Sequence, residues 1–196
     1  MALLSNLIKQ RLQFPEQYEA RSLESLDWLR KQLSPIRFQQ DDLAYDDDLE
    51  REDRAYPVLG EMYVYFYGAK WDKKLPYWDR FPVVIPFRYT NNGWYGLNLH
   101  YIAPRYRVLL LDAFYDKFEI NEDTGAFTKE SITYDRLISA TVFKYSKPCI
   151  KRYLIKQMQS PLFRVPPKFW DIVALLPVQD FTINANKVYS KSREQF

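Results

Sequence analysis

Three short segments in the middle of the chain have the residue pattern of β-strands. They read EMYVYFYGAK (61–70), FPVVIPFRY (81–89) and WYGLNLHYI (94–102). All three are rich in aromatic and β-branched residues, and in the third the apolar side chains alternate with Asn98 and His100. The tripeptide NNG at 91–93 is a turn signal. The pattern predicts a small antiparallel sheet, in which the two prolines of 81–89 indicate an edge strand or a bulged one.

The segments around this predicted sheet have the apolar spacing of helices. Before the sheet, helices are expected over 3–12 and, after a suitable capping residue in Ser22, over 23–33. After the sheet, helices are expected over 104–119, 132–143 and 147–158, whereas 169–176 fits a helix or a strand equally well. The predicted fold class is therefore α+β, with a small antiparallel aromatic-rich sheet of about three strands packed with C-terminal helices and preceded by a helical N-terminal arm.

A run of acidic residues interrupts the chain between the first helices and the sheet. Residues 41–53 (DDLAYDDDLERED) hold eight acidic residues and one arginine. Like charges at this density repel one another and resist compact packing. We therefore predict a helical N-terminal arm at 1–40, an acidic linker at 41–55 and an α+β core domain at 56–196. Because the apolar stripe of the arm is too narrow for a core of its own, Leu26, Trp28 and Leu29 are predicted to dock on another subunit.

Aromatic residues are unusually frequent, with 16 Tyr, 13 Phe and 5 Trp. This content indicates either a thick aromatic core or packing against partners, since aromatic side chains carry much of the binding energy at interfaces. The segment LPYWDRFP (75–82) presents three of them between two prolines, which restrict the backbone. Tyr77, Trp78 and Phe81 are therefore predicted as anchors, either of a protein interface or of a tightly packed loop.

Basic residues gather in the last part of the chain, although the net charge is only +3. From Thr141 onward there are ten Lys or Arg residues against three acidic ones. Lys147, Lys151, Arg152 and Lys156 would form a strip on the helix expected over 147–158. Two interpretations are open: the strip contacts DNA phosphates without reading the base sequence, or it is only a solvated face.

Residue types that carry catalysis are scarce. His100 is the only histidine, and nothing near it in the sequence completes a catalytic triad or a metal site. Cys149 lies among basic residues but lacks a partner base, so it is interpreted as a small buried residue. Glycine-rich phosphate loops are absent, and the acidic alternation at 46–50 lacks the glycine of a calcium loop. The sequence predicts a protein that is not an enzyme, with no metal and no cofactor.

Cysteine content and hydropathy indicate the cellular compartment in which the protein folds. A single cysteine excludes an intrachain disulfide framework and fits a reducing interior. No apolar run reaches the ~18 residues of a membrane span, so no membrane partner is expected.

Several blocks of the chain resemble a family of virion proteins from T-even-like myophages and their cyanophage relatives. The most specific block, 75–113, contains LPYWDRFP and GLNLHYIAPRYRVLLLDA. Further blocks are SLDWLR and YFYGAK upstream, and KPCIKRYL (147–154) and WDIVALLP (170–177) downstream. Trp78 departs from the pattern, in which relatives tend to have tyrosine. The resemblance covers most of the chain from residue 22 to residue 177.

Proteins of this family are often labelled DNA end protector, a neck or head-completion protein, or simply structural protein. The resemblance implies a structural component of a tailed-phage virion, at the neck, tail or baseplate, assembled in the host bacterial cytoplasm. Its partners would be other virion subunits in a symmetric assembly, with contact to the packaged DNA end left open. The alternative is a DNA-binding protein that protects free genome ends. The family pattern carries over no catalytic residues.

Overall fold

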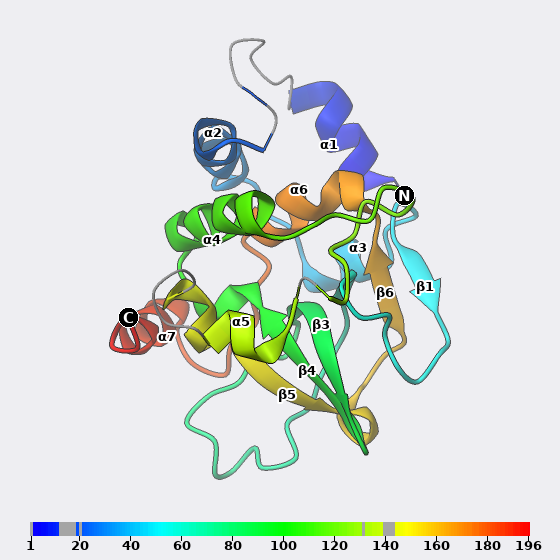
Figure 1. Cartoon of the computed structure of the whole chain (residues 1–196), viewed down its shortest axis with the longest axis vertical. Coiled ribbons are helices and arrows are strands. Elements are labelled where there is room, and N and C mark those ends of the chain that lie inside the picture. The colour runs from blue at the N-terminus through cyan, green and yellow to red at the C-terminus, as the bar shows by residue number, and fades with distance from the viewer. Residues whose placement is uncertain (1, 12–18, 20, 131, 139–143) are drawn as a thin grey trace.

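An antiparallel sheet forms the middle of the computed structural model, which describes residues 2–11, 19, 21–130, 132–138 and 144–196 (Figure 1). Its strands within this part of the chain are β1 (Glu50–Glu52), β2 (Met62–Val64), β3 (Val83–Thr90), β4 (Gly93–Asn98), β5 (Ile150–Leu154) and β6 (Leu162–Val165). The order is β1-β6-β2-β3-β4-β5, and every neighbouring pair is antiparallel. The two edges are therefore the acidic strand β1 and the basic strand β5.

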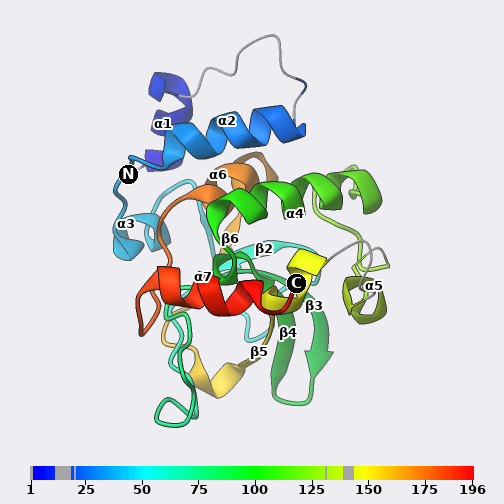
Figure 2. The same ribbon diagram turned by 90° about the vertical axis from the view of Figure 1, so that its left-hand side faces the viewer.

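Helices cover one face of this sheet (Figures 1 and 2). The α-helices are α1 (Leu3–Arg11), α2 (Leu23–Leu33), α3 (Gln40–Ala44), α4 (Pro104–Lys117), α5 (Tyr134–Ile138), α6 (Trp170–Leu175) and α7 (Ala185–Arg193). Short 3-10 helices are η1 (Leu99–Tyr101), η2 (Lys144–Cys149), η3 (Ile155–Gln157) and η4 (Pro167–Phe169). Figure 2 shows α4 and α6 above the sheet and α2 packed over both.

Successive residues of a strand point to opposite faces of the sheet. Both faces of this sheet are apolar, because each carries a cluster of buried residues. Val64, Ile85 and Leu97 belong to the main core together with the helices. A second cluster of buried residues contains Tyr63, Tyr65, Tyr67, Val84, Trp94, Tyr153 and Leu162. Its rings make edge-to-face and stacked contacts, with centroids 5.1 Å apart for Tyr67 and Tyr153 and 6.0 Å apart for Tyr65 and Trp94. Much of the high aromatic content is thus used within the chain.

The predicted strands account for half of the sheet. β2, β3 and β4 match the three strand-like segments, and α2 and α4 match the helices expected over 23–33 and 104–119. Residues 169–176, which were open between helix and strand, hold α6. The α+β class is confirmed, but the number of about three strands is wrong because β1, β5 and β6 complete the sheet.

Two helix predictions have different outcomes. The helix expected over 147–158 is wrong, since this segment forms β5 flanked by η2 and η3. The helix expected over 132–143 is represented by the short α5, and residues 139–143 lie outside the described residues.

β3 is an interior strand although it contains Pro86. It pairs with β2 on one side and with β4 on the other, and its register with β4 shifts between Pro86 and Arg88. The bulged alternative is therefore confirmed and the edge alternative is wrong. Pro86 has no N–H to donate, but its carbonyl accepts a hydrogen bond from the Gly60 N–H at 2.8 Å.

The acidic segment contains regular structure and buried side chains. It begins within α3 and ends with β1, and Leu43 and Asp46 are buried. The Asp46 carboxylate accepts hydrogen bonds from the backbone N–H groups of Leu3 and Leu4 at 2.9 and 3.0 Å, which places it at the N-terminus of α1. A carboxylate is stabilising there because it faces the positive end of the helix dipole.

Charge repulsion at the other end of the acidic segment is relieved by one arginine. Arg164 of β6 forms ion pairs with Glu50, Glu52 and Glu61. The acidic segment is thus folded against the sheet and α1 rather than extended. The division of the chain into arm, linker and core domain stays a prediction.

Candidate nucleic-acid interface

The four basic residues of the predicted strip lie on three different elements. Lys147 is in η2, Lys151 and Arg152 are in β5, and Lys156 is in η3. The common helical face expected for them is therefore wrong, because successive side chains of a strand point to opposite sides. β5 is nevertheless an edge strand, on which Arg152 is exposed and Lys151 is half-buried.

The long loop between β2 and β3 lies near β5. Its tip is a turn at Trp71, whose carbonyl accepts hydrogen bonds from the N–H groups of Lys74 and Leu75 at 2.8 and 2.9 Å. The Trp71 side chain is 55% exposed. At the base of the loop, the Tyr67 N–H donates to the Arg80 carbonyl at 2.9 Å. The loop therefore presents an exposed indole on a backbone that hydrogen bonds hold in place.

The three aromatic residues predicted as anchors in this loop have different positions. Phe81 is fully buried, with its ring centroid 4.9 Å from that of Phe66, so it stabilises the fold. Tyr77 and Trp78 are half-buried and line a cavity. A role for them in a protein interface stays a prediction.

The predicted interface residues of α2 pack largely against other helices of the same chain. Leu26 and Leu29 are each 1% exposed, and α2 packs on α4 and α6. Trp28 is half-buried against the same core. Docking of this helix on another subunit stays a prediction, and in this structure the two leucines are covered by the chain's own helices.

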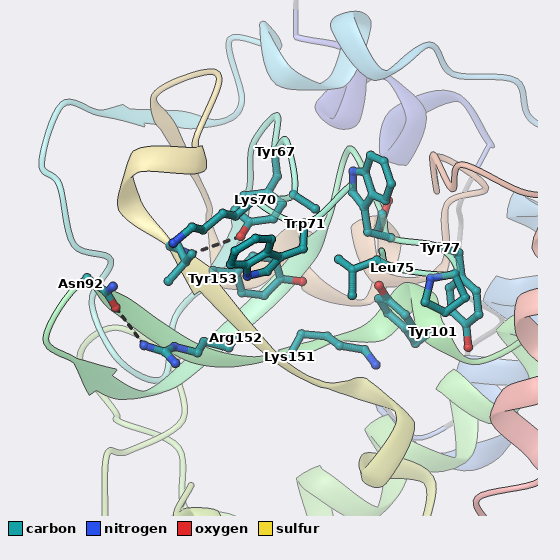
Figure 3. Close-up of a pocket in the computed structure, with 15 residues that line it drawn as sticks. Tyr67, Lys70, Trp71, Leu75, Tyr77, Asn92, Tyr101, Lys151, Arg152 and Tyr153 are labelled. Carbon is teal, nitrogen blue, oxygen red and sulfur yellow. Dashed lines mark hydrogen bonds between the residues drawn. The ribbon is translucent and has the colours of Figure 1, made fainter. Parts of the chain in front are cut away.

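A cavity of about 550 Å³ lies between the long loop, β5 and the turn that joins β3 to β4 (Figure 3). Its aromatic lining consists of Tyr67, Trp71, Tyr77, Trp78, Tyr101 and Tyr153, and its basic lining of Lys70, Lys151 and Arg152. Cavities of this size, with apolar walls and a few polar groups, are typical ligand sites. Proteins that bind single-stranded nucleic acid combine the same groups, with cations for the phosphates and aromatic rings for the bases.

Lys151 extends within this cavity. Its ammonium group lies 3.9 Å from the centroid of the Tyr101 ring, and burial lowers its pKa. Among the described residues, no carboxylate forms an ion pair with it. A half-buried cation without an anionic partner is costly, so an anionic ligand would complete the site.

Further cations extend the positive surface on both sides of Lys151. Arg152 points toward the other end of the cavity, where it donates to Asn92 Oδ1 at 2.9 Å (Figure 3). The same two residues also line an open groove, together with Arg88 and Tyr89. The ammonium of Lys70 lies 5.0 Å from the centroid of the Trp71 ring.

The remaining predicted residues lie outside the cavity. Lys156 lines a neighbouring depression of about 330 Å³ together with Arg80. Lys147 is exposed on η2. The fold thus brings Lys151 and Arg152 to the cavity and Lys156 near it. Sequence reasoning missed Lys70 and Trp71, although the adjacent pair KW was a detectable signal.

Sequence reasoning also missed the partner of His100. Asp79 Oδ2 lies 2.8 Å from His100 Nδ1, and both side chains are buried. Burial lowers the pKa of His100. Burial alone would raise the pKa of Asp79, but the contacts with His100 and Asn98 outweigh it and leave that pKa lowered. The pair joins the end of the long loop to η1, and Asp79 also lines the cavity.

The other candidates for chemistry are also buried or have local partners. Cys149 is buried, and burial raises the pKa of its thiol to about 12. Such a thiol is inert at neutral pH, which confirms the interpretation of a small buried residue.

Within the described part of the chain, no group of three or more His, Cys, Asp or Glu side chains is placed to hold a metal ion. None of the described helices is both long enough and apolar enough to cross a membrane.

Comparison with known proteins points to a phage family. A family model described as phage T4 terminal DNA protecting protein matches residues 40–194. The matched range includes every residue that lines the cavity and all four residues of the predicted basic strip. Searches of curated proteins and of solved structures gave no match.

Proposed function

The chain belongs to the family of phage T4 terminal DNA protecting proteins, and from this membership we propose that it binds the ends of phage DNA and shields them from nucleases. Of the two functions that the sequence left open, the family favours end protection over a general structural role in the virion. The observation that carries the proposal is the cavity, in which Lys151 and Arg152 lie among aromatic side chains.

Binding alone is sufficient for this function, because an occupied end is inaccessible to an exonuclease. The cations along β5 and the long loop would neutralise phosphates, which gives affinity without base recognition. We further propose that the protein stays with the packaged DNA in the virion, after assembly in the host cytoplasm, and that other virion subunits are its partners there.

Exonuclease digestion of linear duplex DNA tests the proposal. The wild-type protein should slow digestion, and the variant K151Q/R152Q/K156Q should lose most of this effect. A matched control, K31Q/K117Q/K129Q, also removes three positive charges, but from residues that do not line the cavity. It should protect DNA as well as the wild type does. Strong protection by the first variant would contradict the proposed site, and no protection by the wild type would contradict the function.

The salt dependence of DNA binding gives an independent measurement. Each phosphate neutralised on duplex DNA contributes about 0.9 to the slope of log affinity against log salt. Loss of three contacts in K151Q/R152Q/K156Q should therefore reduce the slope by roughly 2.7, whereas the control triple variant should keep the wild-type slope. Equal slopes for the two triple variants would mean that β5 is only a solvated edge.

A further inference from the structure

We propose that the cavity holds one unpaired terminal nucleotide of a DNA strand, with its 5′-phosphate against Lys151 and its base against the aromatic walls. This inference rests on the proposed function and specifies which part of the DNA the site recognises. It predicts that the protein distinguishes an end from internal duplex, and a phosphorylated end from an unphosphorylated one.

The aromatic lining favours a single nucleotide over intact duplex. In duplex DNA the faces of the bases are covered by their neighbours, so an aromatic side chain can stack only on a base that has left the helix. Leaving the helix costs least for a base that is already unpaired, and the last base pair of an end has a neighbour on one side only. A cavity of about 550 Å³ lies within the usual range of roughly 300 to 1,000 Å³ for small-molecule sites.

Trp71 is the side chain best placed to contact the base. It is 55% exposed on the tip of the long loop, and the ammonium groups of Lys70 and Lys74 lie 5.0 and 5.2 Å from its ring centroid. Figure 3 shows its indole within the group of residues that line the cavity, near Tyr153. An exposed indole between two cations offers stacking and phosphate attraction together.

The two cations of β5 mark the two ends of the cavity. Figure 3 shows Arg152 directed toward Asn92, on the side of the open groove, and Lys151 directed toward Tyr101 and Tyr77. The rings of Tyr101 and Tyr77, whose centroids lie 6.1 Å apart, line the cavity at the Lys151 end. We place the end of a strand that enters from the groove at Arg152 against Lys151.

The chemistry of Lys151 selects the kind of phosphate. A terminal monoester carries about −1.5 to −2 charges at pH 7, as phosphorylated side chains do, whereas an internal phosphodiester carries a single charge. A half-buried ammonium without a carboxylate partner gains most from the more strongly charged group. This difference points to a terminal 5′-phosphate rather than to an internal phosphate.

Binding to three DNA duplexes of equal sequence tests the inference. The first is a hairpin with one open end that carries a 5′-phosphate, the second has a 5′-hydroxyl at that end, and the third is a closed dumbbell without ends. The wild-type protein should bind the phosphorylated end about tenfold or more tightly than the hydroxyl end, as expected for a hydrogen bond to a charged group. It should bind the dumbbell most weakly.

Variants connect this preference to the cavity. Lys151→Gln should abolish the difference between phosphate and hydroxyl ends, and Lys151→Arg should retain part of the difference. Trp71→Ala should weaken binding to both open ends. Deoxyadenosine 5′-monophosphate should compete for the phosphorylated end better than either deoxyadenosine or inorganic phosphate, because the site takes base and phosphate together.

The outcomes separate this inference from the proposed function. Equal wild-type affinity for all three duplexes would overturn the terminal site while leaving DNA binding intact. A phosphate preference that persists in Lys151→Gln, with an unchanged circular dichroism spectrum, would overturn the assignment of Lys151. Absence of DNA binding by the wild type would overturn both proposals.

Discussion

Asp79 connects three segments of the chain at a single buried carboxylate. Its Oδ2 accepts hydrogen bonds from Asn98 Nδ2 at 3.0 Å and from His100 Nδ1 at 2.8 Å. Its Oδ1 accepts from the backbone N–H groups of Phe81 and Asp180, each at 3.2 Å. The carboxylate thus joins the end of the long loop to β4, η1 and the segment before α7, and it holds the wall of the cavity in place.

Replacement of Asp79 by Asn should destabilise the protein strongly. An amide has one acceptor oxygen, so its NH₂ group would face donors that now bind the second carboxylate oxygen. The expected loss in the free energy of unfolding is on the order of 3 kcal/mol, as for a broken buried pair. Urea denaturation measures it, and the exposed Asp72→Asn is the matched control, with a change expected within about 0.5 kcal/mol. A change of similar size in both variants would contradict this role of Asp79.

Arg107 shows how a purely structural cation differs from Lys151. Arg107 is fully buried, and its guanidinium donates to the carbonyl groups of Ile102 and Ala174, each at 3.0 Å. Further acceptors are Gln179 and the Tyr189 hydroxyl. Lys151, in contrast, contacts the face of the Tyr101 ring. The donors of Arg107 are satisfied by the fold, whereas we propose that the ammonium of Lys151 binds a ligand.

At the scale of the elements, strands with a strong internal pattern could be predicted from the sequence and strands held by partners could not. The segments of β2, β3 and β4 are rich in aromatic and β-branched residues, and a turn signal separates β3 from β4, so the sequence predicts them. β1 reads ERE and has no apolar residue. It pairs because Glu50 lies opposite Arg164 of β6, which is 114 residues away in the sequence.

β5 was mistaken for a helix for a related reason. Ile150, Leu154 and Ile155 have helical spacing, and the strand alternation is weak because an edge strand is partly exposed on both sides. The basic residues of the site could therefore be listed from the sequence, but not their arrangement around a cavity. Trp71 meets these residues only because the fold brings the long loop next to β5.

The capping of α1 by the acidic segment gives a prediction at the same scale. Asp46→Ala removes the acceptor of two backbone N–H groups at the start of α1 and should lower the free energy of unfolding by about 1 to 2 kcal/mol, as other cap removals do. Thermal or urea denaturation measures the loss. Asp53→Ala is the control, since the Asp53 side chain is 80% exposed and makes a surface ion pair only. If both variants have wild-type stability, Asp46 does not hold α1.

For the molecule as a whole, acidic and basic residues lie at opposite edges of the sheet. The edge at β1 carries Glu50 and Glu52, which pair with Arg164, and the edge at β5 carries Lys151 and Arg152. Under the proposed function, a DNA strand would be attracted to the second edge more than to the first. The acidic segment, predicted to be a linker, would then help to orient the protein on DNA.

Limited proteolysis distinguishes the predicted linker from the packing seen in the structure. A protease that cleaves after acidic residues has eight potential sites between Asp41 and Asp53. An extended linker would be cleaved there first, whereas cleavage of a folded segment requires local unfolding. Because this segment holds α3 and β1 and caps α1, we expect it to resist cleavage in the native protein and to be cleaved in urea. Asp46→Ala should increase the native cleavage rate in this segment, since the variant removes its bonds to α1. Rapid native cleavage of the wild type between Asp41 and Asp53 would instead show that residues 1–40 form a separable arm, available to another subunit.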